Sequence, residues 1–360
     1  MGSGRGRRRG AAIVLAALLS ACASQWSHAP APTVQAAAET MPVASFGDAA
    51  DDVAIWVHPA DPARTLIVAT DKRRGLEVYA LDGSLRQSMP VGRMNNVDLR
   101  DGFALGGRRV TVVAASDRDH DAIALFAMSA DRPELVDVAD GLRSTGLSRI
   151  YGLCMFADRA NDRLYVFVNG KDGRYEQHEL LATPEGRITT RVARTFRVAT
   201  RPEGCAADDE LGWLYVGEEA VGFHRMAAAP DAPATLVTVD RVGSGRLVAH
   251  VEGIAIQRQA DGGGHLVVSS QGDDAYAVYR RQPPNEFVGR FTVVAGIVDG
   301  TSGTDGLEVT SERLPPPFDE GLLVVQDGRN SSPSARQNFK LIPWREVRRA
   351  LPEPARPQPR

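Results

Sequence analysis

The hydrophobic residues between residues 40 and 345 are grouped in short runs rather than spread at helical spacing. These runs are rich in β-branched and aromatic residues, and Gly, Asp and Asn residues separate them. Short runs of this kind, bounded by turn residues, are typical of β-strands. The pattern therefore predicts an all-β fold for this part of the chain.

A segment of similar character recurs six times, roughly every fifty residues. Each copy begins with a polar residue, usually acidic, which a small or branched residue and an apolar strand follow. The six copies are Asp52-Val53-Ala54-Ile55, Asn96-Val97-Asp98-Leu99, Tyr151-Gly152-Leu153-Cys154, Glu203-Gly204-Cys205-Ala206, Glu252-Gly253-Ile254-Ala255 and Asp305-Gly306-Leu307-Glu308. Their near-equal spacing favours a repeated unit over two stacked β-sandwiches.

Each unit contains further strands after this first one. A more hydrophobic second strand ends in polar residues, and a third and, in most units, a fourth strand follow. The pattern predicts a six-bladed β-propeller with four antiparallel strands per blade. The sixth unit lacks a fourth strand after Trp344, so we expect an N-terminal strand around Met41 to Ala44 to close the ring.

The polar residues that open the first strands should gather at one mouth of the propeller. The first strand of each blade lines the central channel, and antiparallel pairing returns the end of the second strand to the same face. We expect a ring of Asp51, Asp52, Asp98, Glu203, Glu252 and Asp305, with Asp71, Glu218, Glu219, Asp273 and Asp327 nearby. Solvated turn residues are the usual explanation of a single acid. That explanation does not account for acids that recur at one place in the repeat.

So many carboxylates in one channel repel each other unless cations or protons lie between them. Oxygen donors on irregular loops suit calcium better than zinc, and the chain has no HExxH or CxxC spacing. Lys72, Arg118 and Lys171 follow three of the second strands and interrupt the acidic ring. Such cations beside bound calcium predict a pocket for a polyanion. Because no GxSxG or Walker motif is present, attack by metal-activated water is the simplest chemistry.

The overall charge excludes a general affinity for nucleic acid. The chain has 42 basic and 45 acidic residues and a formal net charge of -3. Any charge-based function must therefore be local. We expect a small polyanionic substrate as the partner, no nucleic acid, and a monomer.

The N-terminus has the features of an export signal. Basic residues precede the apolar run Ala11 to Leu19, which is too short to span a bilayer. The run ends in Leu19-Ser20-Ala21-Cys22, which resembles a bacterial lipobox. Residues 1–22 are therefore predicted to be a lipoprotein-type signal peptide with Cys22 as the lipidation site. An ordinary cleaved signal is the alternative.

These features predict the organisation and location of the whole chain. We expect residues 23–40 to form a flexible tether, residues 41–348 the propeller domain, and residues 349–360 a disordered tail. The protein is then exported, and it is either lipid-anchored in the bacterial outer membrane or periplasmic or extracellular. It contacts a membrane only through the lipid on Cys22.

Cys154 and Cys205 are the cysteines that remain after Cys22. Two cysteines do not make a disulfide framework of the kind that holds small secreted domains together. One bridge between them is an alternative. We favour two unpaired thiols that are buried as small hydrophobic side chains.

The same segments resemble the β-propeller phytases, also called alkaline or calcium-dependent phytases. The similarity spans about residues 45 to 345 and touches every unit. Matching segments are 51–59, Asn95-Asn96-Val97-Asp98, 167–173, Tyr175-Glu176-Gln177, Glu203-Gly204, 207–210, Gly217-Glu218-Glu219, Ser269-Ser270-Gln271-Gly272, 299–302, Thr304-Asp305-Gly306, Gln326-Asp327-Gly328 and Asn338-Phe339-Lys340. The family releases phosphate from calcium phytate, inositol hexakisphosphate. The resemblance therefore implies a 3-phytase that uses several calcium ions.

The resemblance also implies roles for individual residues. It implies a calcium cluster at the mouth on Asp52, Tyr151, Glu203, Glu218, Glu252 and Asp305, and a more structural calcium on Asp299, Asp327 and Asn330. It implies that Lys72, Arg118 and Lys171 bind substrate phosphates, and that the catalytic residues are Tyr151, Glu203, Glu218, Lys171 and Arg118. Two positions depart from the family pattern. His250 and Gly303 each stand where the family commonly has Asp, so one calcium site is expected to be weakened or altered.

Two other function classes use the same fold. Calcium-dependent propeller lactonases also place a metal in the channel but need few cations around it, whereas this chain offers Lys72, Arg118 and Lys171. A non-catalytic module would use the propeller only as a recognition face. The combination of acidic and basic residues in one ring favours the phosphate hydrolase.

Overall fold

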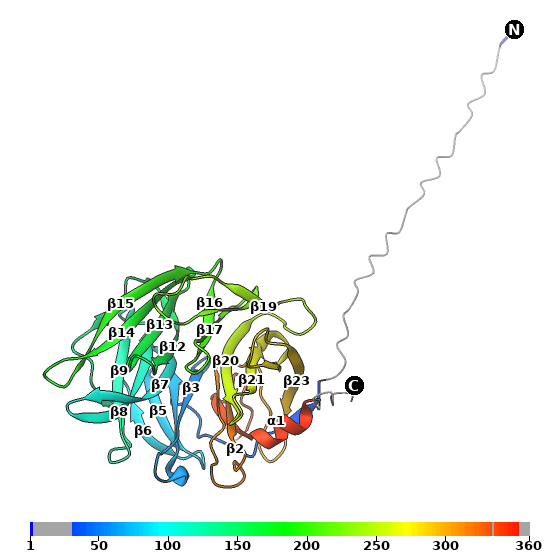
Figure 1. Cartoon of the computed structure of the whole chain (residues 1–360). Coiled ribbons are helices and arrows are strands. Elements are labelled where there is room, and N and C mark those ends of the chain that lie inside the picture. The colour runs from blue at the N-terminus through cyan, green and yellow to red at the C-terminus, as the bar shows by residue number, and fades with distance from the viewer. Residues whose placement is uncertain (3–30, 333–334, 353–360) are drawn as a thin grey trace, which may run out of the picture.

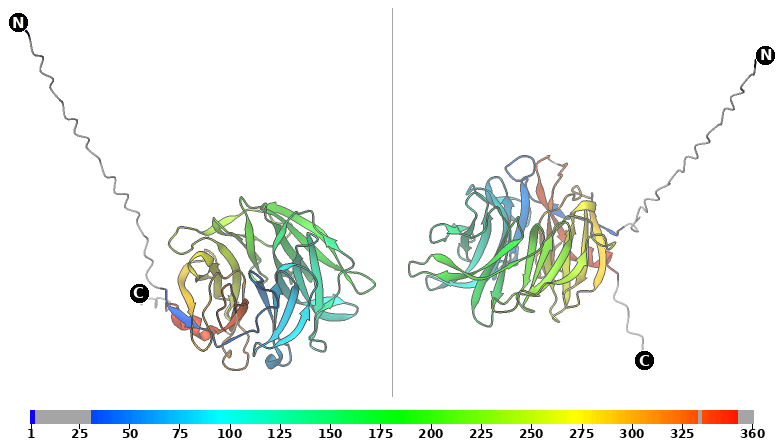
Figure 2. Two further views of the ribbon diagram at one scale, coloured as in Figure 1. Left: turned by 180° about the vertical axis from the view of Figure 1, so that it is seen from behind. Right: turned by 90° about the horizontal axis from the view of Figure 1, so that it is seen from above.

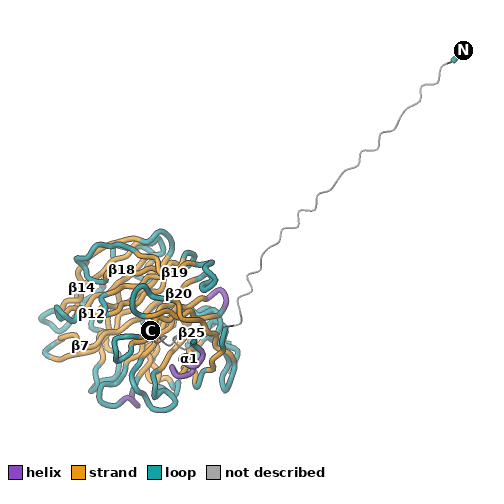
Figure 3. The backbone as a smooth tube through the Cα atoms, turned by 45° about the vertical axis from the view of Figure 1, so that its right-hand side comes forward, coloured by secondary structure: helices purple, strands orange, loops and turns teal. Residues whose placement is uncertain are grey.

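The computed structural model describes residues 1–2, 31–332 and 335–352. Almost all of the predicted signal peptide, including Cys22, and residues 353–360 of the predicted tail lie outside the described residues. Strands make up most of the described chain, and helix is confined to short segments (Figure 3). No described helix has the length and apolar character that crossing a bilayer requires.

The strands form six sheets around a central axis, which confirms the six-bladed β-propeller (Figures 1 and 2). Consecutive strands within a blade pair antiparallel. Blades are numbered in chain order. Blade 1 contains β3 (Ala50–Trp56), β4 (Leu66–Asp71), β5 (Gly75–Ala80) and β6 (Leu85–Met89). Blade 2 contains β7 (Met94–Leu105), β8 (Arg108–Asp117), β9 (Ala122–Met128) and β10 (Val136–Asp137), and β11 (Arg143–Ser144) also pairs with β9.

The remaining blades repeat this plan, with the innermost strand first. Blade 3 contains β12 (Ile150–Asp158), β13 (Arg163–Gly170), β14 (Arg174–Ala182) and β15 (Ile188–Arg197). Blade 4 contains β16 (Pro202–Asp208), β17 (Trp213–Glu218), β18 (Gly222–Ala227) and β19 (Val237–Arg241). Blade 5 contains β20 (Val251–Arg258), β21 (Gly264–Ser270), β22 (Ala275–Arg280) and β23 (Phe287–Val294). Blade 6 contains β24 (Leu307–Thr310), β25 (Leu322–Asp327) and β26 (Asn338–Pro343), which α1 (Trp344–Ala350) follows.

Two strands from the N-terminal segment complete blades 5 and 6. β1 (Thr33–Gln35) pairs parallel with β23, and β2 (Ala38–Glu39) pairs antiparallel with β26 as the outer strand of blade 6. The segment around Met41 to Ala44, which was expected in that place, forms no strand. The prediction of a tether over residues 23–40 is also wrong for residues 33–39, because pairing with β23 and β26 draws them into the propeller. Likewise, α1 extends into the predicted tail.

The hydrophobic core consists of six clusters, and each cluster joins two neighbouring blades. Trp56 and Val68 of blade 1 share a cluster with Phe126 of blade 2. Ile67 of blade 1 shares another with Leu341 of blade 6, so the ring is continuous. The second strands are therefore covered on both faces, which explains their unbroken apolar sequences. Packing of this kind holds the inner strands in fixed positions around the channel.

Cys154 and Cys205 form a disulfide, so the prediction of two unpaired thiols is wrong. The two cysteines lie on β12 and β16, the innermost strands of adjacent blades, with their Cα atoms 5.7 Å apart. Inner strands of neighbouring blades lie side by side, which brings residues 51 positions apart into bridging distance. Sequence spacing does not show this, because it depends on the register between blades.

We expect the double variant Cys154→Ser/Cys205→Ser to unfold more readily than the wild type, by about 2–4 kcal/mol. The physical reason is that a cross-link over a sequence separation of 51 restricts the unfolded chain. Urea unfolding followed by tryptophan fluorescence measures the difference. A reductant should lower the midpoint of the wild type and leave that of the variant unchanged, and equal stability of the two proteins would contradict the prediction.

Candidate active site and metal centre

The innermost strands of five blades carry a β-bulge at the same point near their first residues. In blade 1 the pairing register shifts between Ala50 and Val53, and blades 2 to 5 have the equivalent shift. A bulge adds an unpaired residue and re-aims its side chain. Each bulge contains two residues, and the first of them, together with the equivalent residue before β24 in blade 6, is called a ring residue. The six ring residues are Asp51, Asn95, Tyr151, Glu203, Glu252 and Asp305.

The second residue of each bulge lies against the main chain of the next blade. A Cβ atom on Gly204 would lie 2.1 Å from the carbonyl oxygen of Glu252, so only glycine fits there. Asp52 and Asn96 hold this position in blades 1 and 2, and Asn96 Nδ2 donates to Asp52 Oδ2 at 3.0 Å. Asp52, predicted as a metal ligand, is therefore displaced from the ring by one residue, and Asp51 takes its place.

Hydrogen bonds and ion pairs connect the ring residues to each other. Lys72 Nζ lies 2.9 Å from Asp51 Oδ2 and 2.9 Å from Asp305 Oδ2. Asn95 Nδ2 donates to Glu203 Oε1 at 2.8 Å and to Asp51 Oδ1 at 3.2 Å. One ammonium group and one amide thus lie between the acids of blades 6, 1 and 4.

Burial raises the pKa values of the acids of the ring. It raises the pKa of Asp51 to about 7 against the opposing charge of Lys72, and the charge of Glu203 adds to the rise. It also raises the pKa of Asp305 to about 7, with repulsion from Asp51 as a further cause. Burial, and then repulsion from Glu252, raises the pKa of Glu203 well above the ordinary range. The mouth therefore holds protons that a divalent cation would displace.

A second set of residues, one per blade, follows the second strands and lies beside the ring. In five blades the backbone N–H of this residue donates to a backbone carbonyl oxygen. The acceptor belongs to the residue two positions before the ring residue, as when Lys171 N donates to Arg149 O at 3.2 Å. We call them the outer residues: Lys72, Arg118, Lys171, Glu219, Gln271 and Gly328. The outer residues are cationic in blades 1 to 3, acidic in blade 4 and uncharged in blades 5 and 6. Because the ring residues of blades 4 to 6 are Glu203, Glu252 and Asp305, the mouth has a basic half at blades 1 to 3 and an acidic half at blades 4 to 6.

Arg118 and Lys171 lie over the aromatic ring of Tyr151. Lys171 Nζ is 3.7 Å and the guanidinium carbon of Arg118 is 5.9 Å from the ring centroid. Arg118 also donates from NH1 to Asn95 Oδ1 at 2.8 Å. Burial, and then the charge of Arg118, lowers the pKa of Lys171. An anion bound between the two cations would offset their mutual repulsion. Lys72 differs from these two cations because it is already paired with acids.

Glu218, predicted as a catalytic and metal-binding residue, faces away from the mouth. Its Oε2 atom accepts hydrogen bonds from Thr200 N and Oγ1, both at 2.6 Å, and its Oε1 atom lies 3.0 Å from His224 Nε2. Successive side chains of an extended chain point to opposite sides, so the next residue, Glu219, turns towards the mouth. Glu219 lines the same cavity as Tyr151. The structure thus places Glu219, rather than Glu218, in the candidate site.

The two positions that depart from the family pattern also line this cavity. His250 Nδ1 lies 3.2 Å from Glu219 Oε2 and 3.4 Å from Glu252 Oε1. Gly303 N donates to Asp274 Oδ1 at 2.6 Å. His250 therefore offers a nitrogen donor at the acidic half of the mouth, whereas Gly303 offers no side chain.

The residues predicted for a structural calcium converge on a buried lysine in blade 6. Lys340 Nζ contacts Asp299 Oδ1 and lies 2.9 Å from Asn330 Oδ1 and 3.4 Å from Asp327 Oδ2. Glu39 of β2 also contacts this ammonium group. The structure brings the three predicted residues together, and an ammonium group lies between them.

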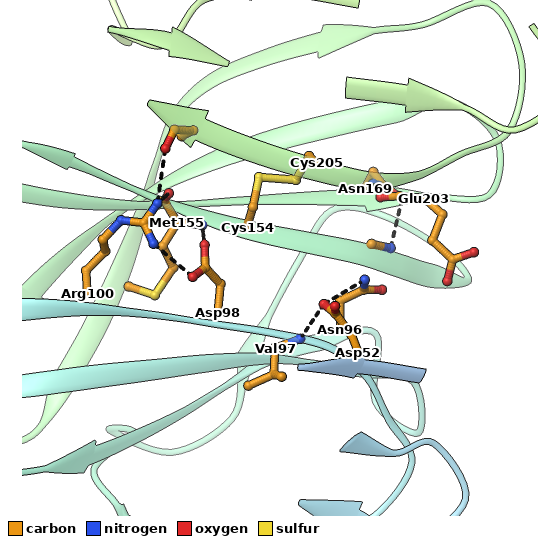
Figure 4. Close-up of a disulfide and its surroundings, with 12 residues drawn as sticks. Asp52, Asn96, Val97, Asp98, Arg100, Cys154, Met155, Asn169, Glu203 and Cys205 are labelled. Atoms are coloured by element: carbon orange, nitrogen blue, oxygen red, sulfur yellow. Dashed lines mark hydrogen bonds and ion pairs between the residues drawn. A yellow bond between two sulfur atoms is a disulfide. The ribbon is translucent and has the colours of Figure 1, made fainter. Parts of the chain in front are cut away.

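Asp98, which was expected in the ring, lies deeper in the channel. Its carboxylate accepts a hydrogen bond from Met155 N at 2.7 Å and pairs with Arg100 NH1 at 2.8 Å. In Figure 4 the Cys154–Cys205 disulfide lies between the Asp98–Arg100 pair and Glu203. The reason is that Asp98 follows the bulge, so its position along β7 is further from the mouth than that of the ring residues.

The sequence predicted no role for Asn95 or Gln271 and placed Glu219 only among the acids near the ring, although all three belong to the site. Gln271 Nε2 donates to Asp305 Oδ1 at 2.6 Å, so it orients a ring carboxylate. Moving the internal alignment by one residue in the first two units would have placed Asn95 among the ring positions. The internal repeat therefore contained the information that identifies Asn95 as a ring residue.

Three ring residues, Tyr151, Glu252 and Asp305, and the outer residues of blades 1, 4, 5 and 6 line a depression of about 570 Å³ at the mouth. Its walls include Lys72, Tyr151, Glu219, Glu252 and Asp305. A cavity of this size admits a small ligand, and its charged walls suit a polyanion that binds together with cations. The arrangement can therefore hold a phosphate ester against divalent metal ions.

In the presence of a chelator, the free energy of unfolding should fall as the pH rises from about 4 to about 7. Asp51 and Asp305 keep their protons to a pKa of about 7 in the folded protein. In the unfolded chain aspartates ionise near pH 4, so the folded state binds more protons in this window and ionisation favours unfolding. Each group contributes on the order of 4 kcal/mol at most. Urea titrations over this pH range measure the effect.

The variant Asp51→Asn serves as the control for this pH profile. It removes one of the two groups with a pKa of about 7, so its stability should fall less steeply over the same range. Added calcium should restore the stability of the wild type at pH 7 and above. A wild-type profile that is flat in chelator would contradict the prediction.

Comparisons with known proteins agree with these features. The family model described as Phytase matches residues 9–356. The 3-phytase of Bacillus subtilis strain 168 is 38% identical over 327 residues, which cover 89% of this chain and 86% of that protein. The PQQ-bound aldose sugar dehydrogenase of Streptomyces coelicolor has a TM-score of 0.50 at 11% identity, and the match covers 86% of this chain and 97% of that chain. The last match shows similarity of fold alone, whereas the sequence matches show that the chain belongs to the phytase family.

Proposed function

We propose that this protein is a 3-phytase, a phosphomonoester hydrolase that releases phosphate stepwise from calcium phytate, myo-inositol hexakisphosphate. The observation that carries the proposal is the pair of cations, Arg118 and Lys171, beside a buried cluster of carboxylates at one mouth. Membership of the phytase family and the identity to a 3-phytase support it. A propeller lactonase needs few cations near its metal. A simple recognition face gains nothing from acids whose burial costs stability.

The donor set at the mouth fits calcium. Carboxylate and phenol oxygens on irregular backbone suit an ion that takes six to eight oxygens in flexible geometry, and the mutual repulsion of the acids favours bound cations. The residues that would hold calcium through oxygen atoms alone are Asp51, Tyr151, Glu203 and Asp305, whereas Glu219 and Glu252 lie beside the nitrogen of His250. Bound calcium supplies a water of lowered pKa and neutralises charge on the phosphate.

The chain itself supplies the phosphate-binding groups. Arg118 and Lys171 would bind phosphate oxygens by charge-assisted hydrogen bonds. Asn95 accepts a hydrogen bond from Arg118 and donates one to Glu203, so it holds the phosphate-binding and metal-binding groups in a fixed relation. Tyr151 lies between the two cations and Glu203, and its hydroxyl group hydrogen-bonds that carboxylate. Lys72 would reach phosphate only if bound metal released it from Asp51 and Asp305.

The predictions on location and assembly stay part of this proposal. A disulfide between Cys154 and Cys205 is typical of an oxidising compartment, which supports export. We retain the lipid anchor at Cys22 in the outer membrane, with a free periplasmic or extracellular protein as the alternative, and a monomer. A structural calcium on Asp299 and its neighbours would have to join or displace the Lys340 ammonium group.

Lys171→Ala should lower kcat/KM for calcium phytate by about 10- to 100-fold, because one charge-assisted hydrogen bond to phosphate is lost, on the order of 1.5–3 kcal/mol. Phosphate release by protein that lacks residues 1–22, with calcium or with a chelator, measures the effect. Lys171→Arg keeps the charge and should retain most of the activity. Equal activity of wild type and Lys171→Ala would contradict the assigned role.

Glu203→Gln should abolish measurable calcium-dependent phosphate release, because it removes a carboxylate at the centre of the cluster while it keeps the side-chain volume. The same assays separate the alternatives. Hydrolysis of a lactone without phosphate release would favour the lactonase, and phytate binding without turnover in the wild type would favour the binding module. Phosphate release that is unaffected by a chelator would exclude the metal-activated mechanism.

A further inference from the structure

Three residues at the junction of blades 4 and 5 form a compact donor set that includes a nitrogen. One donor atom each from Glu219, His250 and Glu252 lies within 4.8 Å of the other two. His250 Nδ1 is 3.2 Å from Glu219 Oε2 and 3.4 Å from Glu252 Oε1. No other such group of three occurs among the described residues. The rest of the mouth offers oxygen donors.

Two buried oxygen atoms of this donor set have no hydrogen-bond partner. They are Glu219 Oε1 and Glu252 Oε2, on side chains that are 3% and 4% exposed. Arg201 contacts the other oxygen of Glu219 but leaves Oε1 without a donor. A buried carboxylate oxygen without a partner is costly, so Glu219 Oε1 is open to a ligand. The Glu252 carboxyl group also interacts with Glu203, and a bound cation would replace that interaction. The observation indicates a cation site and not only a set of acids.

The position is also accessible to ions from solvent. The His250 side chain is 45% exposed, and all three residues line the depression at the mouth. Arg201, which pairs with Glu219, is also 45% exposed. An ion bound here would lie in the same cavity as Tyr151 and Asp305.

We propose that Glu219, His250 and Glu252 bind a first-row transition-metal dication of the zinc and cobalt type in preference to calcium. Calcium takes oxygen ligands, whereas an imidazole nitrogen together with carboxylates suits zinc and related ions. The remaining ring acids keep an all-oxygen set. The mouth is then a mixed centre, with one nitrogen-containing site on the acidic half and oxygen sites beside it.

This inference deepens the proposed function because it concerns a metal of the same site. Its role in phosphate release rests on the phytase activity, but the metal preference itself does not. A transition-metal ion holds a bound water more acidic than calcium does, so it would extend the supply of hydroxide to lower pH. The metal preference is therefore tested by binding first and by activity second.

The test measures binding of each metal alone to protein that a chelator has freed of metal. Isothermal titration with Co²⁺, Zn²⁺ and Ca²⁺ gives affinities, and the visible absorption of bound Co²⁺ reports whether a nitrogen ligand is present. We expect Co²⁺ and Zn²⁺ to bind more tightly than Ca²⁺ at one site in the wild type. His250→Asp should weaken their binding by at least about 10-fold, change the Co²⁺ spectrum and strengthen Ca²⁺ binding.

Two further variants make the comparison specific. His120→Ala removes a histidine that is 56% exposed and pairs with Asp117, outside the donor set, so it should bind metals like the wild type. His250→Gln removes the nitrogen ligand without adding a charge and serves if His250→Asp does not fold, which circular dichroism shows. Equal affinity for Co²⁺ in the wild type and in the folded His250 variant, or tighter binding of Ca²⁺ than of Co²⁺ and Zn²⁺ to the wild type, overturns the proposal.

Phosphate release from phytate by the same samples separates the two proposals. If the metal preference holds and no metal supports phosphate release, the phytase assignment fails while the metal site stands. If calcium supports phosphate release and His250→Asp leaves metal selectivity unchanged, the metal site fails while the phytase assignment stands.

Discussion

The close approach of the inner strands at the mouth is the constraint on which this site depends. Where the main chain of one blade meets the next, no room remains for a side chain, as at Gly204 against Glu252. The bulge that permits this contact turns the preceding residue into the channel. Six side chains, one from each blade, then point into one small volume. Their charges have to be balanced there, whatever the residues are.

The charges of the ring residues are balanced in different ways on the two sides of the ring. Lys72 lies between Asp51 and Asp305, so an internal cation offsets those charges. The neutral Asn95 and Tyr151 occupy the ring in blades 2 and 3, beside the basic outer residues. Burial raises the pKa values of the adjacent Glu203 and Glu252, and repulsion from Glu252 adds to the rise for Glu203. The demand for added positive charge is therefore greatest at blades 4 and 5, and the capacity for an anion is greatest at blades 2 and 3.

The sequence predicted the propeller and most of its strands because hydrophobic runs and turn residues recur in each unit. It did not show which residue of each bulge faces the channel, since packing against the next blade decides this. The one-residue error at Asp52 and the choice of Glu218 over Glu219 both have this origin. The disulfide was missed for a related reason. The disulfide depends on how β12 and β16 are positioned relative to each other along the channel, and no local sequence pattern shows this.

The pairing of β2 with β26 has a consequence for the order in which the molecule assembles. The two partners in this pairing come from opposite ends of the chain, and Lys340 reaches Glu39 across 301 positions of sequence. Contacts of such separation form late, since the entropy of closing a long loop must be overcome first. Blade 6 supplies Asp305 to the mouth, so a chain that lacks its C-terminal segment cannot complete the ring of side chains. The composition of the mouth therefore depends on the last part of the chain to be synthesised, although most of its residues come from blades 1 to 5.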